Sequence, residues 1–388
     1  MSESYKFEGW VAKNKDSVKG QLVWEEYTPK PFEETDVDIQ MGEESDGDAD
    51  GMAEIEAVRD LSADTLSFGL ITHCGICASD LHTLRSGWGE TDYPQVVGHE
   101  IVGKVVKVGS KVTHLKLGDR VGVGAQAGSC LNCEYCTRGD EPYCNKGMIG
   151  TYGGRFPDNS KSYGGYADYT RVPAHFVFKI PDGIPSDIVA PMMCGGVTVY
   201  SPLKQGGAAP GKRVGVVGIG GLGHFALLFG KAMGADMVAI SHSKSKKADA
   251  EKMGVKQFIS THDDENWSEA NARSLDLIVC TANNSDMPIQ KYLRLLKPGS
   301  SFILVGAPEE PLPQIPAFAF ISHNVFLGGS LIGGTKIIEE MLQVAVKSDV
   351  KTWIQVRNMK DANAAVVDMD AGKARYRYVL VNEKHANL

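Results

Sequence analysis

Residues 74–100 gather the side-chain types that bind metal ions and transfer protons. The chemically active members are Cys77, Ser79, Asp80, His82, His99 and Glu100. Zinc prefers thiolate and imidazole ligands, and a catalytic zinc needs only three protein ligands, so that a fourth position stays open. Cys77 and His99 supply two ligands, and a third must come from elsewhere. The alternative is that Cys74 and Cys77 form a redox pair or are buried thiols, with His99 a core residue.

A second cysteine cluster follows in one short segment, with two, two and seven residues between its members Cys130, Cys133, Cys136 and Cys144. Four thiolates on one loop match a closed tetrahedral zinc site, which would hold a loop that has almost no hydrophobic core of its own. An iron–sulfur cluster is the alternative. Cys194, after Pro181 and Pro185 in a segment expected to be helical, is either the missing third ligand or a small core thiol, and spacing alone does not decide.

A glycine fingerprint lies between a fully apolar strand at residues 213–217 and an apolar helix pattern. Its glycines are Gly218, Gly220, Gly221 and Gly223. They allow a tight turn and let a dinucleotide pyrophosphate approach the backbone donors at the helix start. Apolar strands alternate with helices after it, which predicts a parallel sheet covered on both faces. A glycine-rich turn that only packs does not explain this whole βαβ context.

The end of the second predicted strand of this unit indicates the coenzyme. An NAD site normally has Asp or Glu there for the ribose hydroxyls. This chain has Ser241, His242, Ser243 and Lys246 in a run without an acidic residue. These groups do not repel a 2′-phosphate and offer it donors, which favours NADP. The alternative is a solvated helix start whose lysines face water.

Length and charge bound the possibilities further. A chain of 388 residues predicts two domains, and a net charge of −8 without a basic run argues against a nucleic-acid surface. The sequence has no run of eighteen apolar residues and no secretory signal, so we expect a cytoplasmic protein away from membranes. Eight cysteines are too few for a disulfide scaffold in a chain of this size.

The elements that must position these residues belong to two architectures. Residues 1–39, 100–124 and 163–180 alternate apolar and polar residues, which predicts strands of a β-rich domain. Residues 40–69 are rich in Asp, Glu and Gly and poor in apolar residues, so we expect a mobile acidic insertion there; a calcium loop is disfavoured because the ligand spacing is not met. The last strand pattern, in residues 375–383, is expected to return to the first domain.

With these motifs in order, the chain resembles the zinc-dependent medium-chain alcohol dehydrogenases. It is most similar to the cinnamyl alcohol dehydrogenase subgroup, especially its fungal NADP-dependent members. The resemblance rests on GICASDLH, GHEIVGKVVKVG, CLNCEYC, YGGYADY, MMCGGVTVYSPL, GIGGLGH and GSLIGG, and covers nearly the whole chain except residues 40–69. It implies an α/β protein with a GroES-like catalytic domain, residues 1–193 and 332–388, and a Rossmann doubly wound domain, residues 194–331.

The resemblance also implies roles for single residues. Cys77, His99 and Cys194 would bind the catalytic zinc, Glu100 would ligate it transiently, and Asp80 would orient His99. A proton would pass through Ser79, the nicotinamide ribose and His82 after hydride transfer. NADP would also contact Leu222 and Thr198, and each chain would hold two zinc ions. Trp88 and a proline-rich segment near Phe318 and Phe320 are candidate substrate walls.

The predicted function is NADP(H)-dependent reduction of aromatic or medium-chain aliphatic aldehydes and the reverse oxidation of alcohols. Homodimers are usual in the family, and residues 324–334 would then lie near the interface. An NAD-dependent polyol dehydrogenase is the main alternative. A zinc-free quinone reductase is disfavoured by both cysteine sites, and a non-catalytic NADP-binding relative is disfavoured because no ligand or relay hydroxyl is missing.

Overall fold

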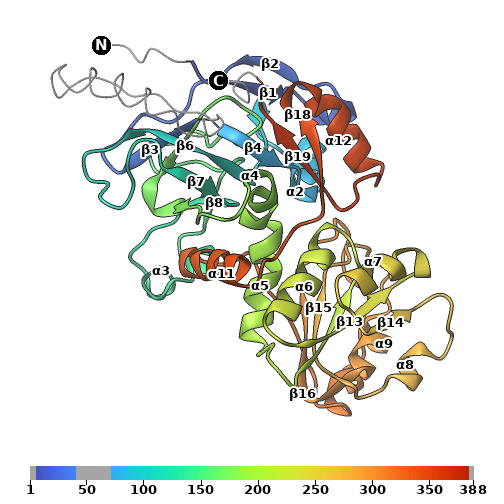
Figure 1. Ribbon diagram of the computed structural model, residues 1–388. Helices are drawn as coiled ribbons and strands as arrows, with labels where there is room; N and C mark the ends of the chain where they lie inside the picture. The colour runs from blue at the N-terminus through green and yellow to red at the C-terminus, as the bar shows by residue number, and fades with distance from the viewer. Residues whose placement is uncertain (1–5, 41–70, 384–388) are drawn as a thin grey trace.

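The computed structural model describes residues 6–40 and 71–383 and forms two bodies joined by a long helix (Figure 1). The upper body in Figure 1 contains both the early part of the chain and its last strands, and the lower body contains the middle. None of the helices within these ranges has the length and apolar character that a bilayer crossing requires. The two bodies carry separate sheets, so the sheets are described in turn.

The first body is built on an eight-stranded sheet and a small three-stranded sheet. The larger sheet runs β10-β3-β6-β4-β19-β18, with β7 also paired to β6 and β11 paired to β7. Its strands are β3 (Asp36–Gln40), β4 (Ile71–Gly75), β6 (Ile101–Val108), β7 (Arg120–Val123), β10 (Thr170–Pro173), β11 (Val177–Lys179), β18 (Ile354–Asn358) and β19 (Arg377–Val381). The smaller sheet contains β1 (Glu8–Ala12), β2 (Val23–Glu26) and β5 (Gln95–Val96), and β8 (Gln126–Gly128) pairs with β9 (Ile149–Gly150).

The last strand of the chain enters the middle of the larger sheet. β19 pairs antiparallel with β4, with Leu380 opposite Cys74, and parallel with β18. The expected return of the last strand to the first domain is therefore confirmed. The predicted insertion at residues 40–69 lies outside the described residues, apart from Gln40 at the end of β3.

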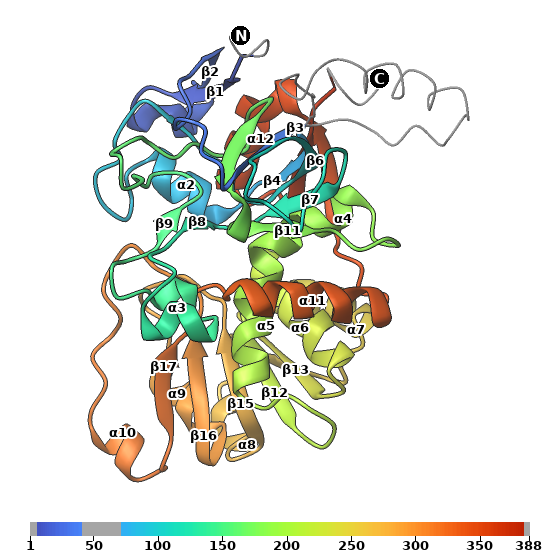
Figure 2. The same cartoon turned by 90° about the vertical axis from the view of Figure 1, so that its left-hand side faces the viewer.

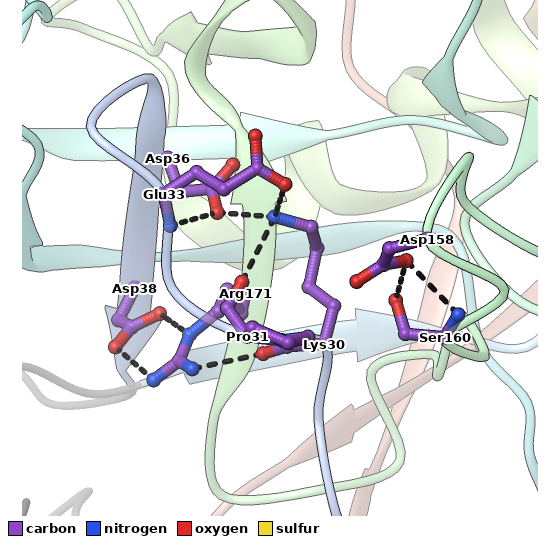
Figure 3. A network of polar contacts seen from close by, with 8 residues as sticks. All are labelled: Lys30, Pro31, Glu33, Asp36, Asp38, Asp158, Ser160 and Arg171. Atoms are coloured by element: carbon purple, nitrogen blue, oxygen red, sulfur yellow. Dashed lines mark hydrogen bonds and ion pairs between the residues drawn. The ribbon is translucent and has the colours of Figure 1, made fainter.

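Buried ion pairs tie β3 to β10, as Figure 3 shows. Arg171 donates to both oxygens of Asp38 at 2.7 and 2.9 Å, and also to the backbone oxygen of Lys30. The ammonium of Lys30 in turn contacts Asp36. Removing one member of a buried pair leaves an uncompensated charge, which costs about 3–5 kcal/mol. The Arg171–Asp38 pair therefore joins β10 to β3, and the Lys30–Asp36 pair holds the loop that leads into β3.

The second body is a six-stranded parallel sheet in the order β14-β13-β12-β15-β16-β17. Its strands are β12 (Arg213–Val217), β13 (Asp236–Ser241), β14 (Gln257–Ser260), β15 (Leu275–Cys280), β16 (Leu296–Leu304) and β17 (Phe326–Gly329). The chain moves outward from β12 to β14 and then starts again on the other side at β15. In such sheets, ligands bind outside the carboxyl ends of the strands at this point of reversal.

Helices cover the second sheet and connect it to the first body. They include α5 (Gly195–Gln205), α6 (Gly221–Ala232), α7 (Lys247–Lys252), α8 (Trp267–Ala270), α9 (Ile289–Arg294), α10 (Phe318–Ile321) and α11 (Thr335–Lys347). The first body adds α2 (Ala78–Leu84), α3 (Glu134–Arg138), α4 (Ser186–Val189) and α12 (Ala362–Asp370). Figure 2 shows α3 beside α11. One apolar core runs from Val102 of β6 through α5 to Val216 of β12, so the two bodies share buried surface.

Candidate active site

A cavity of about 480 Å³ lies between the two sheets and is lined from both. The first body contributes Cys77, Ser79, His82 and Trp88 around α2. The second contributes the glycine turn after β12 and residues at the ends of β13 and β15. Arg377, the first residue of β19, also lines it. The cavity thus opens at the carboxyl edge where the strand order reverses.

Helix α2 positions the first group of functional side chains. Cys77 is the residue before the helix, and its backbone N–H donates to Asp80 in the first turn at 2.8 Å. This contact satisfies a backbone donor at the helix start that has no partner within the helix. Because Ser79 and His82 are three residues apart, they project from neighbouring turns of one helix face. The local sequence therefore sets the placement of a thiol, a hydroxyl and an imidazole together.

Four buried donors form the first metal-binding cluster. Donor atoms of Cys77, His99, Glu100 and Cys194 all lie within 4.8 Å of one another. The thiols of Cys77 and Cys194 are 3.9 Å apart, close to the roughly 3.8 Å that two sulfurs have across a tetrahedral zinc with bonds of about 2.3 Å. His99 Nε2 and Glu100 Oε2 are buried without a hydrogen-bond partner. These unpartnered atoms and the close thiols fit a zinc ion.

The charge balance of this cluster points in the same direction. Hydrogen bonding to Cys194, together with the nearby charge of His99, lowers the pKa of the Cys77 thiol well below its ordinary value, although burial opposes this. Burial alone would lower the pKa of His99, but Cys77, Asp80 and Glu100 raise it to about 9. The Cys77 thiolate therefore lies beside a protonated His99, and a metal ion would take the place of that proton.

Groups around the cluster hold the ligands in place. Asp80 accepts from the backbone N–H of Gly98 at 3.2 Å and from the hydroxyl of Tyr166 at 3.0 Å. The ring of Tyr152 stacks on His99 with centroids 5.1 Å apart. Asp80 thus contacts the backbone of Gly98, the residue before His99. Its role in orienting His99 would be indirect and stays a prediction.

The second cluster lies away from the cavity. The thiols of Cys130, Cys133, Cys136 and Cys144 lie within 4.8 Å of one another, with Cys133 and Cys136 3.5 Å apart and Cys130 and Cys136 3.9 Å apart. The backbone N–H groups of Cys130 and Lys146 each lie 3.4 Å from the Cys144 sulfur. Four thiol ligands without a carboxylate or histidine fit a closed structural zinc site.

The glycine turn has the geometry that a dinucleotide requires. Gly218 has a φ of +86°, a conformation that glycine adopts without strain. A Cβ atom on Gly223 would lie 1.9 Å from the oxygen of Gly218, so the helix can approach the strand only with glycine there. Gly218, Gly220, Gly221 and Leu222 line the cavity, and Gly223 acts in packing instead.

Five predicted coenzyme contacts lie outside the glycine turn, and only some of them reach the cavity. Ser241, His242 and Lys246 line it, whereas Ser243 and Thr198 do not. Ser243 lies next to Ser245, with their hydroxyls 3.1 Å apart. Thr198 is buried in α5. The structure therefore brings together three of these five predicted coenzyme contacts.

Comparisons with known proteins match both halves of the chain. Residues 70–182 match the alcohol dehydrogenase GroES-like domain, and residues 221–347 match the zinc-binding dehydrogenase domain. The NADP-dependent alcohol dehydrogenase 6 of Saccharomyces cerevisiae is 38% identical over 98% of each chain. The chain belongs to the zinc-dependent medium-chain alcohol dehydrogenases.

Solved structures agree with this assignment. A cinnamyl alcohol dehydrogenase of Sorghum bicolor is 34% identical, with a TM-score of 0.84 over 97% of this chain and 98% of that one. The CAD of Helicobacter pylori complexed with NADP(H) is 33% identical, with a TM-score of 0.82 over 98% and 99%. The predicted family, fold class, enzyme class and cofactors, zinc and NADP(H), are confirmed.

Two residues of this alcohol dehydrogenase site were not found from the sequence. Arg377 forms a buried ion pair with Glu100, and burial nevertheless raises the pKa of Glu100 to about 7. Glu309 contacts His82 from the second body. In each pair, Arg377 with Glu100 and Glu309 with His82, the two residues are more than two hundred positions apart in the sequence. Local spacing therefore does not predict these contacts.

The predicted substrate walls are only partly placed at the site. Trp88 lines the cavity and its ring stacks on His82, with centroids 4.3 Å apart. Phe318 is 74% exposed on α10, and neither Phe318 nor Phe320 lines the cavity. The expectation for these two phenylalanines is therefore wrong. Gly306 and Ala307, which precede the proline-rich segment, line the cavity instead.

Proposed function

We propose that this chain is an NADPH-dependent aldehyde reductase that also oxidises the corresponding alcohols, with aromatic cinnamyl-type or medium-chain aliphatic substrates. One observation carries the proposal. The end of β13 offers Ser241, His242 and Lys246 to the same cavity that contains Cys77, and residues 241–247 include no carboxylate. A ribose-binding acid is therefore replaced by donors suited to a phosphate.

Cys77, His99 and Cys194 would hold the catalytic zinc, and Glu100 would be a reserve ligand. Zinc, when bound, polarises a carbonyl oxygen as a Lewis acid, and NADPH supplies hydride. Arg377 keeps Glu100 in place when Glu100 is not a ligand, because the buried pair satisfies its other oxygen. Cys130, Cys133, Cys136 and Cys144 would hold the structural zinc.

Ser79 and His82 would transfer the proton that the reduction of the aldehyde requires. Ser79 Oγ lies 3.5 Å from Cys77 Sγ, which places a hydroxyl beside the proposed metal. His82 lines the same cavity one helical turn away and can resupply the proton to it. Trp88 gives the cavity a flat apolar wall next to His82, which suits an aromatic or aliphatic substrate better than a polyol.

Three further expectations are kept as proposals. Residues 1–193 and 332–388 form the catalytic domain and residues 194–331 the coenzyme domain, which the confinement of the six-stranded sheet to residues 213–329 supports. A homodimer through β17 is supported by its edge position and by the exposed rings and aliphatic chains of Phe318, Ile321, Phe326 and Leu331. We also propose a cytoplasmic location.

Metal analysis combined with a matrix of substrates and coenzymes tests the proposed function. The expected result is two zinc ions per chain and faster oxidation of NADPH than of NADH with cinnamaldehyde, benzaldehyde and hexanal. Sorbitol or xylitol with NAD would be poor substrates. A preference for NAD and a polyol would refute the proposal in favour of the polyol dehydrogenase alternative.

A further inference from the structure

A carboxylate from the second body reaches the imidazole of His82. Glu309 lies in the loop that follows β16, and its Oε1 contacts His82 Nδ1 on α2. The same oxygen accepts a hydrogen bond from Arg85 Nε at 2.8 Å. In Figure 2, α2 and β16 belong to the upper and lower halves of the molecule, so the contact joins the two bodies.

The loop is held against α2 at two further points. Trp88 Nε1 donates to the backbone oxygen of Ala307 at 3.1 Å. The Trp88 ring stacks on the His82 ring at an interplanar angle of 19°. Arg85 also donates to Asp370 of α12 at 2.6 Å, so its guanidinium is fixed from both sides. His82 itself is 5% exposed and sits between the carboxylate and the indole.

The charges around His82 determine which nitrogen carries its proton. Hydrogen bonds from Arg85 and His82 lower the pKa of Glu309, so this group is an ionised acceptor. A carboxylate can only accept and a guanidinium can only donate. Arg85 Nη2 lies 3.3 Å from Nδ1, farther than the Glu309 carboxylate, so the carboxylate is the nearer partner of Nδ1. His82 must donate from Nδ1, which leaves Nε2 to exchange protons.

We propose that Glu309 is a positioning residue for the proton relay. It holds His82 in the Nδ1–H tautomer while the loop after β16 lies against α2. The inference rests on the proposed function, because it takes His82 as the residue that resupplies the proton. During aldehyde reduction, His82 releases its Nε2 proton and regains one from water, while Glu309 stays ionised and the Nδ1 proton stays in place.

The geometry offers two ways to remove this contact. Glu309→Gln keeps the shape of the side chain and removes its charge. Gly87→Ala keeps every functional group, but its Cβ would lie 2.1 Å from a carboxylate oxygen of Glu309, so the flexible carboxylate must move. Glu310→Gln is the matched control, since Glu310 is the next residue on the same loop and carries the same carboxylate.

Steady-state kinetics with NADPH and a saturating aldehyde give the first readout. We expect Glu309→Gln and Gly87→Ala to lower kcat about tenfold, a fraction of the hundredfold or more that an acid–base group contributes, with a much smaller change in KM. Glu310→Gln should match the wild type. In a His82→Gln background, Glu309→Gln should have no further effect, because it acts through His82.

Nitrogen-15 NMR of histidine gives a second readout that needs no turnover. The His82 signals are assigned as those lost in His82→Gln, and the wild type should show the Nδ1–H tautomer, with a mixed population in Gly87→Ala. Equal losses of kcat with and without His82 would overturn the inference, as would an unchanged tautomer together with unchanged kcat in both variants. Absence of aldehyde reduction by the wild type would instead count against the proposed function, and the tautomer would still decide the contact.

Discussion

Lys246→Ala tests the coenzyme assignment at one side chain. Lys246 lies at the start of α7, lines the cavity with Ser241 and is partly buried, with its ammonium 5.7 Å from the ring centroid of Tyr376. Burial, and then the charge of Arg375, lower the pKa of Lys246. An ammonium held in this way is positioned to gain from an anionic partner. The 2′-phosphate of NADP is the partner that NAD lacks.

The size of the effect follows from this environment. A hydrogen bond to a charged group contributes about 1.5–3 kcal/mol. Because Lys246 remains partly exposed to water, we take the lower part of that range, about 1.5–2 kcal/mol, which corresponds to roughly tenfold to thirtyfold in kcat/KM. The loss should appear with NADPH only. With NADH, the same substitution removes no contact to the coenzyme, so kcat/KM should stay within about twofold of the wild type.

The assay titrates NADPH and NADH separately at saturating cinnamaldehyde. Lys247→Ala is the matched control, because Lys247 is the next residue, is 51% exposed and lies 3.6 Å from Glu251. It should change neither coenzyme parameter. An equal loss with both coenzymes in Lys246→Ala would refute the phosphate contact, and no loss with either would show that the lysine only faces water.

Three further predictions concern the metal clusters and pH. Cys77→Ser should abolish turnover while one zinc per chain, NADPH binding and the melting temperature are kept; activity in zinc-loaded protein would contradict the ligand role. Cys133→Ser should lower the melting temperature and remove one zinc, and an unchanged value of both would exclude a structural site. Against the effect of burial, hydrogen bonds from His175 and Thr335 lower the pKa of Glu141 to about 2. Its contribution, on the order of 3 kcal/mol, is therefore present above about pH 4.5 and lost as pH falls toward 2. Glu141→Gln should thus be less stable than the wild type in urea at pH 7, with a difference that shrinks at pH 3.5; a constant difference would refute this.

Much of the fold was accessible from sequence because its signals are local. The apolar strands around Gly218 and the alternating strands after Glu100 each specify their own type of sheet through side-chain period. The cysteine spacing at 130–144 likewise keeps four ligands on one loop. These features need no information from distant parts of the chain.

The remaining features depend on contacts between residues that are far apart in the sequence and meet only in the folded chain. Arg377 and Glu309 meet their partners from other strands and loops, and neither has a motif around it. The prediction for the proline-rich segment near Phe318 was wrong for the same reason. Its apolar content predicts burial, but the segment does not line the cavity beyond Ala307, and the Phe318 ring is exposed. For β19, the sequence predicted a return to the first domain but did not predict that β4 would be its partner.

The position of β19 has a consequence for how the protein is made. β4, which emerges early from the ribosome, has β19 as a sheet neighbour, and Glu100 has Arg377 as its buried partner. The six-stranded sheet, in contrast, is continuous from residue 213 to residue 329 and can fold as soon as it has emerged. The middle of the chain is therefore expected to fold before the beginning does. A nascent chain shorter than 377 residues would have a complete six-stranded sheet beside a first sheet that lacks β19, with Glu100 still without its Arg377 partner.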